Sequence, residues 1–286
     1  MGICLHLGSL PYTPGRAVQA NRRPLSACVI TRDEESNIEA CLASLAFCDE
    51  RVVVDCGSTD RTVALARSAG ARVVEIDWPG MIAQKNRAAD AAAHDWILSI
   101  DADERVSDAL RASILAATIG DGDGGAAGYA MAWETVYLGG PIRSDRGRAR
   151  WKLRLYDRRR GRWEGHEPHG HVHVAGTVPR LTGPLYHTTV RSLEQHVAKT
   201  NAYTDAAALE LRGQGRSLAF GLLVRPPAAF LRSFVLRGGF RDGARGFIVA
   251  VNAAAYVFLK YAKLWELRHP DAPEDGPASG GSPGRP

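Results

Sequence analysis

The sequence lacks the motifs that mark several large enzyme classes. In its 286 residues no G-x-G-x-x-G fingerprint and no G-x-S-x-G turn follows a predicted strand, and there is no P-loop. These motifs place glycine backbone against a dinucleotide, a nucleophilic serine above a sheet, or backbone amides around phosphates. Their absence argues against a dehydrogenase, a serine hydrolase and a P-loop NTPase.

Cysteine is scarce, and all of it lies near the start of the chain. The five residues are Cys4, Cys28, Cys41, Cys48 and Cys56, with no C-x-x-C pair. Because their number is odd and several lie in apolar runs, we expect buried free thiols in a reducing compartment.

Targeting and membrane-spanning signals are also missing. Residues 1–23 have no continuous apolar core of the signal-peptide kind, which favours a disordered leader or an upstream start codon chosen in error. No apolar run reaches the roughly 18 residues of a spanning helix. The closest, residues 247–259, is shorter and contains Asn252.

Acidic residues are few in two stretches of this basic chain. The net charge is +5, but residues 141–163 carry ten Arg and Lys against two Asp, and residues 212–245 carry seven Arg against Asp242. Such patches bind nucleic acid, anionic lipid or phosphorylated substrates. Aromatic residues interleave the first patch, but no RNA-recognition signature accompanies them. We therefore favour a phosphate-decorated substrate and predict no nucleic-acid partner.

Short apolar runs alternate with helical patterns through the first hundred residues. Strands alternating with helices of this length predict a parallel sheet with crossover helices. Ser36-x-x-Glu39 resembles a capping box opening the first helix. The predicted strands cover residues 25–31, 51–55, 71–76 and 96–100.

The later chain follows a different pattern. A strand over 128–137 begins a smaller mixed region, and Ser192-x-x-Gln195 caps a helix that runs to about Leu211. Residues 225–265 combine apolar side chains with flanking arginines. They fit either helices lying in the cytoplasmic membrane interface or a core helix pair with arginines on its solvated face.

Residues 96–104, WILSIDADE, form the most informative stretch. A buried strand that ends in Asp101-Ala102-Asp103 places carboxylates at the carboxyl edge of a sheet, where open α/β sheets bind ligands. Mg²⁺ or Mn²⁺ held by few carboxylates and by substrate phosphates would relieve their repulsion. An isolated D-x-D more often marks a solvated acidic turn, so the choice between a metal site and such a turn depends on the rest of the chain.

Four motifs in this order resemble those of the family 2 glycosyltransferases, over roughly residues 25–268. Further motifs in the second half resemble the branch of lipopolysaccharide core β-1,4-glucosyltransferases that act on heptose. Two positions depart from the family pattern, Glu34 in place of Asn and Cys56 in place of Ser. The four motifs are Ile30-Thr-Arg-Asp-Glu-Glu35, Val54-Asp-Cys-Gly-Ser-Thr-Asp-Arg-Thr62, Gln84-Lys-Asn-Arg87 and Asp101-Ala-Asp-Glu104.

The resemblance implies the GT-A nucleotide-sugar-binding α/β fold, a Rossmann-like, mostly parallel sheet with a mixed acceptor region and a C-terminal helical extension. The expected boundaries are a disordered leader over 1–23, a glycosyltransferase domain over 24–190, a helical extension over 191–268 for which membrane association is one of the two alternatives, and a disordered tail over 269–286. Within the domain, residues 24–125 would bind the nucleotide sugar and residues 126–190 the acceptor.

The resemblance also assigns donor-binding roles by position. Thr31 and Glu35 would line the nucleoside pocket, and Asp55 would accept a hydrogen bond from the base, usually uracil. Lys85 and Arg87 would face the diphosphate, although charges on a helix face are more often simply solvated.

The remaining roles concern the metal and the reaction. Asp101 would lie near ribose and metal, Asp103 would be the direct ligand of Mn²⁺ or Mg²⁺, and His187 would be a further contact to metal or diphosphate. Glu167 would be the general base of an inverting transfer, with Glu164 as the fallback. A divalent cation offsets the charge that develops on the leaving diphosphate.

The predicted activity is therefore the metal-dependent, inverting transfer of a hexose, in the first instance glucose from a UDP-sugar. The acceptor would be a glycan or a lipid-linked glycan such as the lipopolysaccharide inner core. The enzyme would be cytoplasmic, peripheral at the inner face of the anionic cytoplasmic membrane.

Three rival hypotheses stay open. A metal-dependent nucleotidyltransferase should carry a glycine-rich basic loop after the first strand, where this chain has acidic Asp33-Glu-Glu35. A non-catalytic glycan or membrane adaptor would be expected to lose at least one of the predicted catalytic carboxylates. A structural zinc site on His169, His171 and His173 is less favoured than a tuned or exposed histidine set, because no cysteine lies nearby.

Overall fold

In this computed structural model the described part of the chain forms two compact units. The first holds residues 22–136 and 150–189, and the second holds residues 137–142 and 190–269. Nearly all of the predicted leader and tail lies outside the described residues. The described residues are 22–119, 125–142, 150–167, 170–215 and 217–269.

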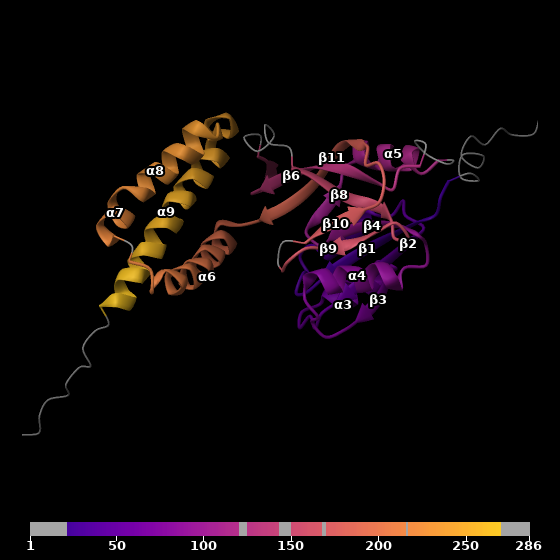
Figure 1. The fold of residues 1–286 in the computed structure, drawn as a ribbon, viewed down its shortest axis with the longest axis horizontal. Coiled ribbons are helices and arrows are strands. Elements are labelled where there is room, and N and C mark those ends of the chain that lie inside the picture. Colours follow the sequence, from indigo (N-terminus) through magenta and orange to yellow (C-terminus); the bar gives the residue numbers. More distant parts are fainter. Residues whose placement is uncertain (1–21, 120–124, 143–149, 168–169, 216, 270–286) are drawn as a thin grey trace, which may run out of the picture. The chain divides into compact units, whose positions relative to one another are not determined.

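Parallel strands begin the sheet of the first unit (Figure 1). β1 pairs with β2 and β4, and β2 pairs with β3, all in parallel. Helices α2, α3 and α4 make the crossovers, so the predicted parallel sheet is confirmed. These elements are β1 (Leu25–Thr31), α2 (Ile38–Ser44), β2 (Glu50–Asp55), α3 (Thr62–Ser68), β3 (Arg72–Glu75), α4 (Met81–Ala91) and β4 (Trp96–Asp101).

Antiparallel strands complete the same sheet, in the order β3-β2-β1-β4-β8-β6-β11-β5. β9 and β10 form a separate antiparallel pair. This combination of a parallel half and a mixed half matches the predicted α/β class. The elements are β5 (Glu104–Val106), α5 (Asp108–Ala117), β6 (Gly128–Tyr137), β7 (Gly140–Pro141), β8 (Arg150–Asp157), β9 (Gly161–Glu164), β10 (His171–Val174) and β11 (Arg180–Val190).

Two apolar clusters make up the core of the first unit. Neighbouring residues of β4 contribute to different clusters, Leu98 to one and Ile97 to the other, as expected where a strand is buried on both faces. Cys28, Cys41 and Cys56 are buried, and Cys48 is partly buried; all four are free thiols, as the sequence predicts. Burial raises the pKa of Cys28 to about 12, so this thiol stays protonated and unreactive.

The second unit is helical. Its longest helix, α9, packs against α6, α7 and α8. α6 begins at Ser192, whose Oγ accepts a hydrogen bond from the backbone N of Gln195 at 3.1 Å, as the sequence predicts. The elements are α6 (Leu193–Leu211), α7 (Leu218–Leu223), α8 (Arg225–Leu231), the π-helical η2 (Arg232–Leu236), the 3₁₀ helix η3 (Gly239–Asp242) and α9 (Gly243–Arg268).

Two helical segments of this unit are long and apolar enough to cross a bilayer, judged by length and composition. They are Leu218–Leu236 and Gly239–Arg268, and in each only 17% of the most apolar window is buried. The expectation that no segment reaches spanning length is therefore wrong by this measure. The difference arises because an unbroken apolar run excludes every polar residue. The mean hydropathy of a helical window stays high despite single polar residues such as Asn252.

Candidate functional site

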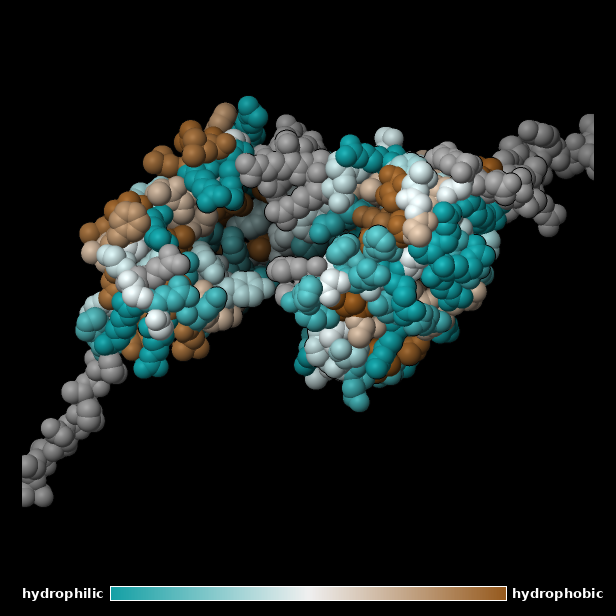
Figure 2. Space-filling model, viewed as in Figure 1, coloured by the Kyte–Doolittle hydropathy of each residue, from teal (hydrophilic) through white to brown (hydrophobic). Residues whose placement is uncertain are grey.

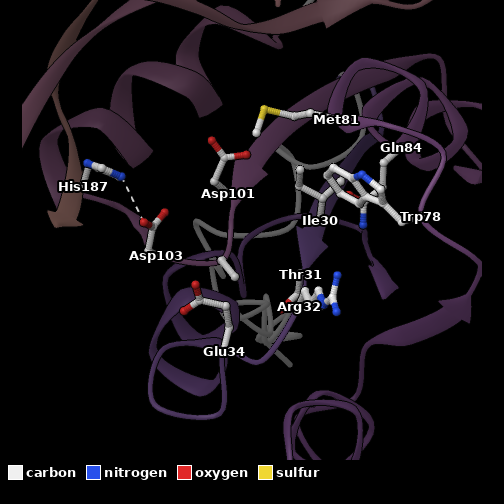
Figure 3. Close-up of a pocket in the computed structure, with 11 residues that line it drawn as sticks. Ile30, Thr31, Arg32, Glu34, Trp78, Met81, Gln84, Asp101, Asp103 and His187 are labelled. Atoms are coloured by element: carbon white, nitrogen blue, oxygen red, sulfur yellow. Dashed lines mark ion pairs between the residues drawn. The ribbon is translucent and has the colours of Figure 1, made fainter. Parts of the chain in front are cut away.

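A pocket of about 320 Å³ opens at the carboxyl ends of β1 and β4, the edge where the sequence predicts ligand binding. Figure 3 shows Asp103 and His187 on one side of this carboxyl-edge pocket, with Trp78 and Gln84 on the opposite side. Asp101 points into the pocket from the end of β4. The structure thus brings together Thr31, Asp101, Asp103 and His187 of the predicted site.

Asp101 is held by two cations. Its carboxylate lies 2.5 Å from Lys85 Nζ and 2.9 Å from Arg154, and its side chain is 30% exposed. Burial alone would raise the pKa of Asp101, but the charges and hydrogen bonds of Lys85 and Arg154 outweigh it and hold this pKa below its usual range. Asp101 is therefore ionised, and its charge is already balanced by the protein.

Glu104 lies behind Asp101 and is fully buried. It accepts hydrogen bonds from Arg154 at 2.8 Å, from Trp133 Nε1 at 2.8 Å and from the backbone N of Asp101 at 3.0 Å. Burial raises its pKa, and the charge of Arg154 opposes that rise. Glu104 thus fixes both the end of β4 and the indole of Trp133.

Asp103 and His187 form the part of the site that faces the pocket. His187 comes from β11, and its Nε2 lies 2.9 Å from the Asp103 carboxylate. Trp133 stacks on the imidazole with ring centroids 4.4 Å apart. Burial would lower the pKa of His187, but the hydrogen bond and charge of Asp103 raise it. The two side chains therefore attract each other where the resemblance expects metal ligands.

The donor set at this position fits a hard divalent cation. Mg²⁺ and Mn²⁺ are commonly held by one or two carboxylates together with waters and substrate phosphates. Asp103 supplies such a carboxylate, and His187 Nδ1 is a buried nitrogen with no hydrogen-bond partner among the described residues. Across those residues no group of three or more His, Cys, Asp or Glu could hold a metal. A cation here would therefore take much of its coordination from the substrate.

The lining of this pocket also contains residues that sequence reasoning missed. Thr31 Oγ1 is buried without a partner in the described structure, and Glu34, Trp78, Met81 and Gln84 join it in lining the pocket. Gln84 belongs to the Gln84-Lys-Asn-Arg87 motif, in which the resemblance assigns roles only to Lys85 and Arg87. A lone Trp78 directly before Pro79-Gly80 was the available signal, since exposed aromatics at loop ends often contact ligands.

Three predicted donor-binding residues lie outside both described pockets. The buried Asp55 carboxylate accepts hydrogen bonds from the backbone N of Gly57 at 3.0 Å and of Ser58 at 2.9 Å, so it holds its own turn. Glu35 accepts from Arg61 N and Nε, each at 3.2 Å. Arg87 is exposed on α4. Their donor-binding roles remain predictions.

Lys85 does not line the carboxyl-edge pocket but a neighbouring one of about 420 Å³, which we call the aromatic pocket. Its walls include Trp133, Trp151 and Trp163, together with Lys152, Arg154 and His171. Lys85 Nζ lies 4.2 Å from the centroid of the Trp163 ring. Met81 and Asp101 line both pockets, so the two cavities adjoin.

Glu167, the predicted base, contacts the first turn of α4. Its Oε1 accepts a hydrogen bond from the backbone N of Ile82 at 2.8 Å. Ile82 directly follows Met81, which lines both pockets, but Glu167 itself is in the lining of neither. The fallback Glu164 is exposed on β9 and pairs in register with His171 of β10. His171 and His173 are exposed, and His169 lies outside the described residues.

Comparison with known proteins gives consistent matches. Residues 26–178, more than half of the chain, match the model of glycosyl transferase family 2. The lipopolysaccharide core biosynthesis glycosyltransferase LpsC of Rhizobium meliloti is 35% identical over 86% of this chain and 93% of its own length. An uncharacterized glycosyltransferase, RT0209 of Rickettsia typhi, is 31% identical over 86% of this chain and 88% of its own.

A solved structure matches part of the chain. It is glucosyl-3-phosphoglycerate synthase from Mycobacterium tuberculosis in complex with Mn²⁺, UDP and phosphoglyceric acid, at 26% identity and a TM-score of 0.33. The match covers 47% of this chain and 50% of that one.

Proposed function

The chain belongs to glycosyltransferase family 2 and has its GT-A fold, and on that premise we propose that it transfers a hexose from a UDP-sugar to a glycan or lipid-linked acceptor with inversion. Glucose is the proposed sugar, and the lipopolysaccharide inner core is the proposed acceptor. The observation that carries the proposal is the Asp103–His187 pair facing a pocket at the carboxyl edge of the sheet. LpsC, whose name assigns it to lipopolysaccharide core biosynthesis, supports the choice of acceptor.

The donor would occupy the carboxyl-edge pocket. Thr31 and Trp78 stand where a nucleoside can hydrogen-bond and stack, and Asp103 with His187 would hold Mn²⁺ or Mg²⁺ against the diphosphate. Such a cation stabilises the negative charge that develops on the leaving diphosphate. Lys85 and Arg154 keep Asp101 ionised and fixed, so its carboxylate can orient the ribose without reorganising.

Glu167 would remove the proton from the attacking acceptor hydroxyl. Inversion requires one base on the face opposite the leaving group and no enzyme nucleophile. In the structure Glu167 uses Oε1 to accept from Ile82, which leaves Oε2 available for a proton. Holding one carboxylate oxygen on a helix amide fixes the direction of the other, as a general base requires.

The acceptor would be reached at the cytoplasmic face of an anionic membrane. The second unit supports this with a set of exposed apolar side chains and with exposed Arg232, Arg237 and Arg241 beside them. Apolar helices with basic flanks bind the interfacial region of anionic bilayers. We propose peripheral contact through these helices.

Calorimetric titration of nucleotide sugars tests the proposal directly. UDP-glucose, UDP-galactose, UDP-N-acetylglucosamine, GDP-mannose and an ADP-sugar are each titrated with Mn²⁺ and with chelator. We expect one UDP-sugar to bind only with metal, and Asp103→Asn to abolish this binding because it removes the anionic ligand. Asp108→Asn, an exposed first-turn residue of α5, is the matched control.

Other outcomes would select a rival. Failure of every nucleotide sugar to bind in the presence of metal would favour the non-catalytic adaptor. Tight binding of a nucleoside triphosphate, with pyrophosphate released, would favour the nucleotidyltransferase.

A further inference from the structure

We propose that Gln84 reads the nucleobase of the donor and selects a base with a ring N–H, as in uracil, over one with a bare ring nitrogen, as in cytosine. This inference rests on the proposed function, in which the carboxyl-edge pocket binds a nucleotide sugar. It concerns a residue to which the resemblance gives no role. Gln84 lines that pocket and is only 1% exposed.

The pocket follows the carboxyl edge of the sheet from β4 across β1 toward β2. Asp103 comes directly after β4, Thr31 ends β1, and the side chain of Gln84 bonds the end of β2. Figure 3 shows Gln84 and Trp78 on the opposite side of the pocket from Asp103 and His187. In a nucleotide the base is the end farthest from the diphosphate. A diphosphate held at Asp103 therefore places the base beside Gln84.

One hydrogen bond fixes the orientation of the Gln84 amide. Its Nε2 donates to the backbone O of Val54 at 3.0 Å, in a buried position. Turning the amide over would place Oε1 against this carbonyl oxygen, and two acceptors cannot bond each other. Oε1 has no hydrogen-bond partner among the described residues. It is therefore the polar atom that Gln84 has left for a ligand, and it can only accept.

Thr31 adds a second polar atom to the same wall. Its Oγ1 is buried and has no hydrogen-bond partner in the described part of the chain. A buried polar group without a partner is costly, so a ligand that bonds it is favoured. An acceptor at Gln84 and a hydroxyl at Thr31 match a ring N–H beside a carbonyl group, which is the edge that uracil presents. Cytosine would turn its bare N3 toward Oε1, with no proton between the two acceptors.

Asp55, to which the resemblance gives the base contact, already uses its carboxylate within its own turn. It accepts hydrogen bonds from the backbone N of Gly57 at 3.0 Å and of Ser58 at 2.9 Å, and from Ser58 Oγ. Asp55 is 1% exposed and lines neither described pocket. Gln84 bonds the preceding residue, Val54, and so offers an acceptor at the same end of β2.

Calorimetric titration of the full chain in the presence of Mn²⁺ tests the inference. The ligands are UDP, CDP and 3-methyl-UDP, in which a methyl group replaces the hydrogen of the ring N–H. We expect UDP to bind about tenfold to a hundredfold more tightly than the other two, because both leave Oε1 without a donor.

A variant identifies the residue responsible for this preference. Gln84→Met keeps the length of the side chain but removes the amide. It should weaken UDP and bring its affinity to within about twofold of that for CDP. Asp90→Asn, at an exposed position of the same helix, is the control and should leave all three affinities unchanged.

A measurement on the unmodified chain covers the case in which Gln84→Met does not fold. When UDP labelled with ¹⁵N at the ring N–H is bound, its imino proton should exchange slowly with water. This proton should also give a nuclear Overhauser contact with the side-chain amide protons of Gln84. A contact with the methylene protons of Asp55, and none with Gln84, would overturn the inference.

The outcomes distinguish the inference from the proposed function. If UDP binds with metal but CDP or 3-methyl-UDP binds equally well, or if Gln84→Met keeps the preference for UDP, Gln84 does not read the base and the proposed function stands. If no nucleoside diphosphate binds in the presence of metal, the proposed function fails and the inference fails with it.

Discussion

Asp101 and Asp103 are separated by one residue, yet their surroundings give them different roles. Asp101 forms ion pairs with Lys85 and Arg154. In the described part of the chain the ion-pair partner of Asp103 is His187 alone. The first carboxylate therefore holds the site together, and the second is the one left to bind a ligand.

The two aspartates should respond differently to the same substitution. Asp101→Asn leaves the buried Lys85 and Arg154 with one fewer anionic partner and should lower the free energy of unfolding by about 3 kcal/mol. Asp103→Asn should leave unfolding nearly unchanged while abolishing metal-dependent nucleotide binding. Urea denaturation and calorimetry of both variants check this, and equal destabilisation by the two would refute the division of roles.

Trp133 makes two contacts, a hydrogen bond to Glu104 and a stacking contact with His187, and substitutions can separate them. Trp133→Phe keeps a ring against His187 but leaves Glu104 without one hydrogen bond, so it should cost about 1–2 kcal/mol of stability with UDP–Mn²⁺ affinity retained. Trp133→Leu also loses the stacked ring and should weaken that affinity by about tenfold. Calorimetry on both variants decides, and loss of affinity in Trp133→Phe alone would contradict the stacking argument.

Sequence reasoning placed Asp101, Asp103, Lys85 and His187 in the site, but it missed Arg154, which pairs with Asp101 and Glu104. A strand ending in Asp101-Ala102-Asp103 carries its own local signal. The pairing of Asp101 with Arg154, 53 residues further along the chain, depends on β8 lying next to β4, which no local pattern encodes. Asp55 was placed by the resemblance alone, and the structure adds that its carboxylate also accepts hydrogen bonds from the backbone N of Gly57 and Ser58.

At the scale of elements, local signals succeeded where they were strong. β1 and β6 have the predicted bounds, and α6 starts at its predicted serine cap and ends at Leu211. The predicted capping box at Ser36 was wrong: α2 begins at Ile38 after Asn37, and no side chain caps it. A turn in which Glu34 O accepts from the backbone N of Asn37 and Ile38 fixes this start instead.

β11, which contains His187, runs close to the start of α5, and Gly183 permits this close approach. Its φ is +95°, and a Cβ there would lie 2.3 Å from the backbone N of Leu110. Gly183→Ala should therefore cost about 3 kcal/mol of stability. Gly213→Ala, which has no atom within 4 Å of its Cβ position, is the control and should be neutral. Thermal unfolding of both variants measures the difference, and equal melting temperatures would contradict the close approach.

At the scale of the whole molecule, the second unit leaves much apolar surface in water. Figure 2 shows brown, hydrophobic side chains gathered over its helices. Leu223 is 74% exposed and Leu236 is 81% exposed, and large patches of this kind mark binding surfaces. Sequence composition suggested either a core helix pair or a membrane surface, and this exposure favours the second.

Vesicle binding tests that choice. We expect the protein to sediment with vesicles containing phosphatidylglycerol and much less with phosphatidylcholine alone, because exposed arginines add about 1 kcal/mol each near an anionic surface. The double variant Leu223→Glu/Leu236→Glu should remove binding to both, and Arg232→Gln/Arg237→Gln should remove the preference for the anionic lipid. Val178→Glu, an exposed site in the first unit, is the control.

Extraction separates a surface helix from a spanning one. A protein that lies on the bilayer is released by alkaline carbonate, whereas one that crosses it through Leu218–Leu236 and Gly239–Arg268 requires detergent. Release by carbonate together with loss of binding in the glutamate variant would establish the interfacial arrangement. Absence of vesicle binding in the unmodified chain would mean that this apolar surface contacts another partner, and the acceptor would then have to reach the enzyme from solution.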